Sequence, residues 1–432
     1  MVDLKKTSDA LCRLAAENGA QGFSTTVFTR EKQELNTEND QFSLYRTTFD
    51  HGAALTVLTE GRKGAASGND LSDEGLAALA QSAMASAASS QPDEANAIAP
   101  CQGSHTFHNG PFAPDMPRFY DRLTEFLAAV ARDYPQVKLM AMIADHTATH
   151  TLYANHNGTA FENFDGVYHV VLEFAGNDGA RTTGIHDAAV AFHDLDTPIL
   201  ALGNVAQALR DAQDSLTTAA TPDKFVGPII MTPALAQYAA SMLVDVAMSG
   251  NVIMAGTSLW RDSIGKAVAS DKVTLRLAVD DERLAERDPF TSDGFLSREV
   301  KLIEKGVLRS HCLDLYAANK SGRPVTANDG ATPIMEPGDD ALSDMIASID
   351  CGLVVGGFSG GHPGPNGELS GVAKNSFLIR HGKIVGAVSE TMISCNLLAL
   401  FRSVSAVSRE AVCSGDSVFP YVKCEGVTVS GK

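Results

Sequence analysis

The sequence predicts an α+β protein with two domains, and three observations lead to this fold class. The chain has 432 residues, 44% of them apolar and 20% charged, which is globular composition with enough length for two cores. Before residue 220, helical periodicity and strand-like runs are mixed. Beyond it, short strands dominate. We therefore expect an N-terminal domain with antiparallel hairpins and helices over residues 1–220 and an antiparallel β-rich domain with few helices over residues 221–432.

The first domain is expected to open with an amphipathic helix at residues 4–18, because apolar residues recur there at helical spacing. A second helix is expected at residues 72–88, where Ser72 offers a cap before an acidic first turn and an alanine-rich run. The other elements expected in this half are strands at 22–30, 41–46, 53–58 and 64–67, an exposed connection at 89–116, a helix at 117–134, a hairpin at 137–142 and 149–155, strands at 167–175 and 188–193, and a helix at 199–216.

The second domain is expected to begin after the break at Thr221-Pro222. Residues 227–231 are typical of a buried strand, and Pro233 opens a helix that runs to about residue 249. The remaining strands are expected at 273–279, 298–303, 307–314, 352–358, 376–380 and 384–388, with glycine-containing turns between them.

Charge limits the partners that the chain can have. It carries 52 acidic and 34 basic residues, a formal net charge of −18, which repels the phosphates of nucleic acids and anionic lipids. We expect neither nucleic acid nor a membrane as a partner. Because no apolar run approaches the roughly 20 residues of a spanning helix and the start does not resemble a signal peptide, we expect a cytoplasmic protein.

The seven cysteines form no CxxC pair and are odd in number. This pattern favours neither a disulfide framework nor a structural zinc knuckle.

Four segments resemble a known family. They are Ala255 to Lys266 (AGTSLWRDSIGK), Asp293-Gly294 followed by Lys301 to Leu308 (KLIEKGVL), Gly352 to Val355 (GLVV), and Gly367 to Ala373 (GELSGVA). Their order and spacing resemble the TldD/PmbA family (peptidase U62, modulators of DNA gyrase), and within it the PmbA/TldE branch. The resemblance covers most of the chain and is strongest after Thr221.

The catalytic branch of that family carries an HExxxH helix, whose histidines hold zinc while the glutamate activates a metal-bound water. The corresponding helix here contains no histidine, and Leu243, Val244 and Met248, or their immediate neighbours, stand where the ligands and base would be. Cys413 matches the region of a further family zinc ligand. One soft ligand without the histidine pair does not hold zinc tightly.

The resemblance therefore implies a non-catalytic, TldE-like subunit, with no catalytic residue, metal ligand or cofactor of its own. Its partner would be an HExxxH-bearing, TldD-like subunit that carries zinc in a heterodimer. The substrate would be a small or unfolded peptide bound as an extended strand. Two alternatives stay open: a hydrolase that acts alone with a non-standard site, and a homodimer that binds peptides without cleaving them.

Other candidate residues have simpler interpretations. His146 and His150 lie in a stretch typical of extended chain, where residues four apart are separated by roughly 13 Å, too far to share a metal. The pairs His186-Asp187 and His193-Asp194 are interpreted as solvated loop residues.

The last three features are also assigned structural roles. The cluster Gly356 to His362 lacks the lysine and helix of a phosphate-binding loop and is interpreted as a flexible loop beside the substrate chamber. Cys413 is interpreted as inert, since a nucleophilic thiolate needs a nearby base. Trp260 is expected in the core or in an interface.

Overall fold

The computed structural model describes residues 2–222, 224–330 and 332–431, which form two β-sheets with helices around them. The α+β fold class is confirmed. The limits of the two domains, at residues 220 and 221, stay a prediction. Within the part of the chain that the structure describes, none of the helices combines the length and apolar character that crossing a membrane requires.

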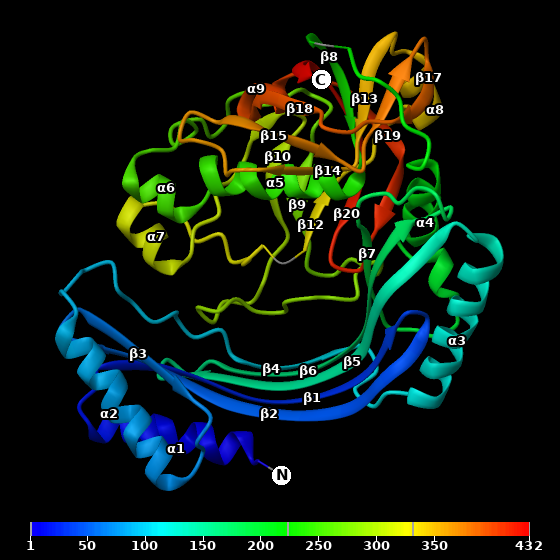
Figure 1. Cartoon of the computed structure of the whole chain (residues 1–432). Helices are drawn as coiled ribbons and strands as arrows, with labels where there is room; N and C mark the ends of the chain where they lie inside the picture. The colour runs from blue at the N-terminus through cyan, green and yellow to red at the C-terminus, as the bar shows by residue number, and fades with distance from the viewer. Residues whose placement is uncertain (1, 223, 331, 432) are drawn as a thin grey trace.

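The first sheet is long and strongly curved, with its concave side toward the second half of the chain (Figure 1). Its strand order is β3-β2-β1-β5-β6-β4, and β7 also pairs with β6. All pairs are antiparallel except β4 with β6. The strands are β1 (Gly22–Glu38), β2 (Gln41–Thr59), β3 (Arg62–Gly68), β4 (Ser104–Asn109), β5 (Val137–Asn155), β6 (Ala160–Gly176) and β7 (His186–Phe192).

Helices cover the two ends of this sheet. At one end, α1 (Leu4–Glu17) and α2 (Asp73–Ser89) pack against Val27, Leu55 and Val57. At the other end, α3 (Met116–Asp133) and α4 (Val205–Asp214) pack against β5, β6 and β7, and η1 (Ile199–Ala201) precedes α4. The helices predicted at 4–18, 72–88 and 117–134 are confirmed, and the one predicted at 199–216 is divided into η1 and α4.

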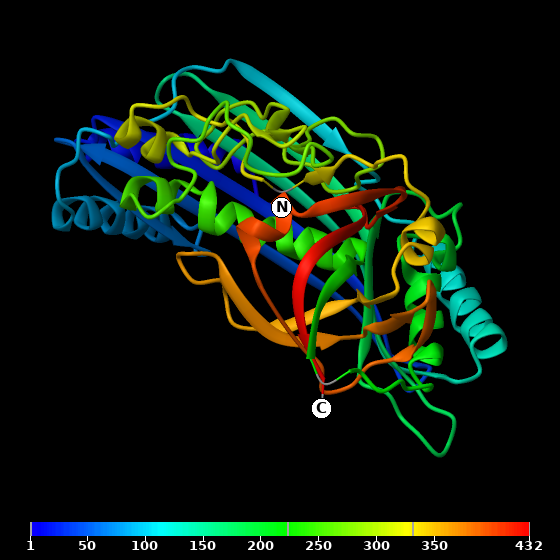
Figure 2. The ribbon, with the colours of Figure 1, turned by 90° about the horizontal axis from the view of Figure 1, so that it is seen from above.

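The second sheet follows the order β11-β10-β9-β12-β20-β8-β13-β16-β17, with β14, β15, β18 and β19 attached beside it. Seen from above, this half lies over the long strands of the first sheet (Figure 2). Its strands are β8 (Lys224–Met231), β9 (Leu275–Leu277), β10 (Val300–Glu304), β11 (Val307–Leu308), β12 (Pro333–Met335), β13 (Cys351–Val355), β14 (Gly357–Gly360), β15 (Glu368–Lys374), β16 (Phe377–Arg380), β17 (Lys383–Ala387), β18 (Met392–Asn396), β19 (Val404–Cys413) and β20 (Val418–Ser430).

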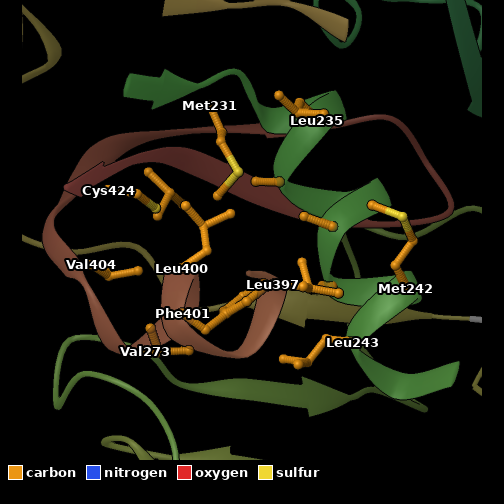
Figure 3. Packing of buried hydrophobic residues seen from close by; sticks show 14 of the residues in the cluster. Met231, Leu235, Met242, Leu243, Val273, Leu397, Leu400, Phe401, Val404 and Cys424 are labelled. Atoms are coloured by element: carbon orange, nitrogen blue, oxygen red, sulfur yellow. The ribbon is translucent and has the colours of Figure 1, made fainter. Parts of the chain in front are cut away.

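The helix α5 (Pro233–Ala247) lies in the core of this half. Thr232 caps it by accepting a hydrogen bond from the amide of Leu235, and proline occupies its first turn. Leu235 and Leu243 of α5 belong to one buried cluster with Leu397, Phe401 and Cys424 (Figure 3). The short helices of this half are α6 (Gly250–Ala255), α7 (Leu315–Ser321), α8 (Leu342–Ala347) and α9 (Leu397–Arg402).

Three predictions about the first sheet were wrong. The two strands expected at residues 41–46 and 53–58 are the single strand β2, which also pairs with β1 between them. The hairpin expected at residues 137–142 and 149–155 is the single strand β5, because β1 and β6 pair with it through the polar middle as well. The connection expected at residues 89–116 contains β4, which pairs with β6 from Ser104 to Asn109. In each case, neighbouring strands supply backbone partners that no local pattern reveals.

Direct contacts hold the two halves together. Asn109 donates a hydrogen bond to the carbonyl of Ala285 at 2.7 Å, and the hydroxyl of Tyr153 donates to the carbonyl of Asp293 at 3.0 Å. The amide of Ala191 donates to the carbonyl of Ser414 at 2.8 Å. The relative position of the sheets is therefore fixed at several points of the first sheet.

Candidate functional site

The exposed face of α5 is the part of the helix that is free to meet a ligand. Ala234, Tyr238, Ser241 and Asp245 are exposed on it, at the spacing of successive helical turns. Of these side chains, only the carboxylate of Asp245 is a usual metal ligand. The described residues contain no group of three or more histidine, cysteine or acidic side chains placed to hold a metal ion. The residues present do not fit a zinc ion.

The positions that sequence analysis singled out on α5 lie in the core. Leu243 and Met248 are both 0% exposed, and Val244 is half-buried. Met248 is the C-cap residue of α5. These side chains pack against the rest of the second half. Their assignment as counterparts of the family's ligands stays a prediction.

Cys413 lies at the end of β19, and its surroundings keep its thiol protonated. The thiol donates a hydrogen bond to the carbonyl of Arg283 at 3.0 Å. Burial raises the pKa of the Cys413 thiol. The segment after Cys413 reaches α5 at Gln237, whose amide donates to Asp416 at 3.4 Å. This segment therefore contacts α5 on the N-terminal side of Leu243.

A row of paired charged side chains crosses the concave side of the first sheet and ends on the second half of the chain. Lys32 Nζ lies 3.3 Å from Asp145, and Asp145 accepts from His169 Nδ1 at 3.3 Å. His169 Nε2 lies 3.1 Å from Glu286 Oε1. At the other end, Arg46 and Lys32 both pair with Glu34. Burial opposes the charged form of His169, but its hydrogen bonds to Asp145 and Glu286 prevail and raise its pKa to about 9.

A cavity of about 320 Å³ lies where this row of charged side chains ends, between the two halves. We call it the β7 cavity. Its walls come from β6, β7, α4, the first turns of α5 and the segment between β19 and β20. Its charged and titratable side chains are His169, His186, Asp187, Asp211, Glu286, Asp416 and Tyr421.

The prediction that His186 is a solvated loop residue was wrong. His186 is the first residue of β7, is 3% exposed, and stacks against Phe174. Burial lowers its pKa to about 4, so the ring is neutral near pH 7. Asp187 beside it is exposed, and His193 just beyond β7 is half-buried. Asp194 is exposed and caps a turn by accepting from the amide of Asp196 at 2.9 Å.

The other candidate histidines and the glycine cluster occupy ordinary structural places. His146 and His150 both lie on β5, so the extended conformation is confirmed; His150 Nε2 is 2.9 Å from Glu162. The prediction of a flexible loop at residues 356–362 was wrong for residues 357–360, which form β14 and pair with β15. Gly356 does line the β7 cavity. Trp260 is 1% exposed and belongs to the core, as expected.

Comparison with known proteins decides the family. The model of the PmbA/TldA metallopeptidase C-terminal domain matches residues 225–431, and that of PmbA/TldA metallopeptidase domain 1 matches residues 27–87. Together these two matches cover more than half of the chain. The chain belongs to the PmbA/TldD family. The resemblance predicted from the sequence is thereby confirmed.

Individual relatives agree with this family assignment. The chain is 27% identical over 410 residues to metalloprotease PmbA of Escherichia coli O157:H7, covering 87% of this chain and 86% of that protein. The crystal structure of TldE from Thermococcus kodakarensis superposes with a TM-score of 0.85 at 19% identity, over 98% of this chain and 100% of that one. A candidate modulator of DNA gyrase from Bacteroides thetaiotaomicron superposes with a TM-score of 0.83 at 21% identity, over 99% of each chain. At these identities, the two structures establish the shared fold.

Proposed function

We propose that this member of the PmbA/TldD family is a non-catalytic, TldE-like subunit. It pairs with an HExxxH-bearing homologue to form a heterodimeric zinc metallopeptidase that acts on small or unfolded peptides. The observation that supports this most directly is the exposed face of α5, on which Asp245 is the only usual metal ligand. A relative that matches most of the chain is named a metalloprotease, so in this proposal the metal chemistry belongs to the partner.

The environment of Cys413 argues against the alternative of a hydrolase that acts alone. A nucleophilic or metal-binding cysteine must lose its proton, and low thiol pKa values arise beside cations or helix N-termini. Burial raises the pKa of Cys413 and outweighs the opposite effects of the Gly415 amide and the Arg283 charge, and the thiol proton is donated to a backbone carbonyl. Among the described residues, no histidine forms a hydrogen bond with this thiol. The thiol therefore has the environment of an inert cysteine.

A pseudo-subunit is physically reasonable in a family of this kind. Two homologous chains can share a pseudo-twofold interface while only one of them retains the reactive groups. The other chain then contributes shape, stability and binding surface. The fixed contacts between the two halves of this chain, at Asn109 and Tyr153, suit that role because they keep its inner surface rigid.

The experiment is to purify the full chain alone and after co-expression with an HExxxH-bearing homologue, and to measure zinc by elemental mass spectrometry. We expect no bound zinc in the chain alone and about one zinc per heterodimer in the complex. The complex should cleave an unfolded peptide, and Cys413→Ala should leave that activity unchanged. Replacing the glutamate of the partner's HExxxH by glutamine should abolish it. Stoichiometric zinc or peptidase activity in the chain alone would overturn the proposal.

A further inference from the structure

The strand β2 has an open edge along residues 41–52. It pairs with β1 from Gln41 to Leu58, whereas β3 lies beside it only from Ala53 onward. No other described strand pairs with β2. The residues from Ser43 to His51 are all exposed. This part of the strand therefore has a sheet on one side and solvent on the other.

The outward backbone groups at this edge have no partner among the described residues. The amide of His51 does not bond to β1 but donates to the carboxylate of Asp50 at 2.8 Å. Amide and carbonyl groups alternate between the two sides of a strand, and the register with β1 is unbroken here, so those of Tyr45, Thr47 and Phe49 also point away from β1. No described residue is hydrogen-bonded to them. They form a row of donors and acceptors at the spacing that a neighbouring strand requires.

This edge also lacks the features that keep strands from associating. Proteins protect open edges with lysine, proline, bulges or a covering element. Residues 44–51 contain neither lysine nor proline, and their pairing with β1 has no bulge. On one face of this stretch, Tyr45 and Phe49 are 62% and 73% exposed. Open hydrogen bonding and exposed aromatic rings together indicate that another strand covers the edge.

The length of the edge fits a second copy of the same chain. A twofold axis through Thr47 places two copies of β2 in antiparallel register, with Thr47 opposite Thr47. Gln41 of one copy then lies opposite Ala53 of the other, the residue at which the other copy's β3 begins to pair. The open stretch of each copy therefore ends where the β3 strand of the other copy begins.

The side chains match in the same register. Tyr45 of each copy lies opposite Phe49 of the other, which gives two cross-strand aromatic pairs. On the opposite face, Arg46 of each copy lies diagonal to Asp50 of the other. Aromatic pairs and opposite charges at these positions stabilise antiparallel sheets. The edge is thus complementary to itself in both shape and charge.

We propose that this chain forms a twofold-symmetric dimer through the open edge of β2. The occupant of the edge is a second copy of the chain, and the two first sheets continue into one antiparallel sheet. This dimer goes beyond the function proposed above and does not depend on it. A homologue of the same fold presents the corresponding strand, so it can replace one of the two copies.

Analytical ultracentrifugation of the full chain between about 1 and 100 µM tests the dimer, because its population depends on concentration. Thr47→Pro removes an amide that points away from β1, so the variant should fold and lose two hydrogen bonds of the dimer. We expect it to weaken dimerisation roughly tenfold or more. Thr47→Val, which keeps the amide, is the matched control and should dimerise like the wild type. Far-ultraviolet circular dichroism confirms that both variants are folded.

Disulfide formation tests the position of the twofold axis. The two Thr47 Cα atoms should be about 5.5 Å apart, within the range that a disulfide spans. The two Thr48 residues are diagonal to each other, about 7–8 Å apart, which is too far. Mild oxidation should therefore give a covalent dimer of Thr47→Cys but not of Thr48→Cys. The wild type controls for its own cysteines, since Cys101 is exposed.

The outcomes that overturn this proposal are distinct from those that overturn the proposed function. A chain that is monomeric throughout this range, or a dimer that Thr47→Pro does not weaken, would overturn the β2 interface. A disulfide in Thr48→Cys but not in Thr47→Cys would overturn the axis at Thr47. A dimer with the expected behaviour that forms no zinc-bearing complex with an HExxxH-bearing homologue would overturn the proposed function alone.

Discussion

Nε2 of His169 lies 3.1 Å from Oε1 of Glu286, and this contact joins the concave side of the first sheet to the second half of the chain. Because Glu286 is 45% exposed, solvent screens the pair, and we expect His169→Gln to lower the free energy of unfolding by about 1 kcal/mol at most near neutral pH. Urea unfolding of the two proteins measures this difference.

The same residue predicts a pH dependence. The folded pKa of His169 is about 9, above the value of about 6.5 in an unfolded chain. Its stabilising effect is therefore complete below about pH 6.5 and is lost as the pH rises through about 9. The difference between wild type and His169→Gln should shrink to nothing above that range. A difference that stayed constant with pH would show that the charge of His169 does not matter.

His186 should act in the opposite direction, at acidic pH. Its folded pKa is about 4 because the ring is buried, so below about pH 6.5 the unfolded chain binds a proton that the folded chain refuses. Stability should fall as the pH falls from about 6.5 to about 4. His186→Phe, which keeps a ring against Phe174, should flatten this decline, while His51→Gln on exposed β2 should not. An unchanged acid slope in His186→Phe would contradict the assignment.

The sequence predicted helices better than strands, for a physical reason. Helices carry their own periodicity and caps, as at Ser72 and Thr232, so local chain is sufficient to find them. The hairpin prediction left the polar centre of β5, residues 143–148, between two strands, although the stretch around His146 and His150 is typical of extended chain. It is held extended by partners more than a hundred residues away in β1. The local sequence does not show which distant strand supplies this pairing.

The β7 cavity could not be predicted for a related reason. Its walls come from segments spread along the chain from His169 to Tyr421, which meet only after the sheets have docked. His186 offered one signal, as a histidine at the start of an alternating apolar run, but nothing in its neighbours indicated burial. The lack of histidine on the central helix, in contrast, could be read from the sequence alone.

Gly294 is predicted to be essential to the junction of the two halves. A Cβ atom there would lie 2.2 Å from the hydroxyl of Tyr153, and the backbone has a positive φ of +89°. Gly265 has a φ of +79°, and a Cβ atom added to it would meet no other atom within 4 Å, so it is the matched control. Gly265→Ala should cost about 1 kcal/mol, from backbone strain alone. Gly294→Ala should lower the free energy of unfolding clearly more than Gly265→Ala does, as measured by urea unfolding. Equal losses would show that Tyr153 can move aside at no further cost in stability.

Leu243 is predicted to be a core residue that cannot be turned into a metal ligand. It is 0% exposed, so Leu243→His would bury an unpaired imidazole and should cost about 3 kcal/mol or more. Ser241→His on the exposed face of α5 should change stability by less than about 0.5 kcal/mol. Thermal unfolding separates the two. A stable Leu243→His protein that bound zinc would show that this part of α5 can open to solvent.

Cys413 should react slowly with alkylating reagents, and this follows from its protonation state. The reactive species is the thiolate, and burial raises the pKa of Cys413 while its thiol donates to the carbonyl of Arg283. Cys101 is exposed and serves as the internal comparison. Limited treatment with iodoacetamide at about pH 7.5, followed by peptide mass spectrometry, should therefore label Cys101 well before Cys413. Preferential labelling of Cys413 would mean that a nearby group activates it, and would reopen the case for a hydrolase that acts without a partner.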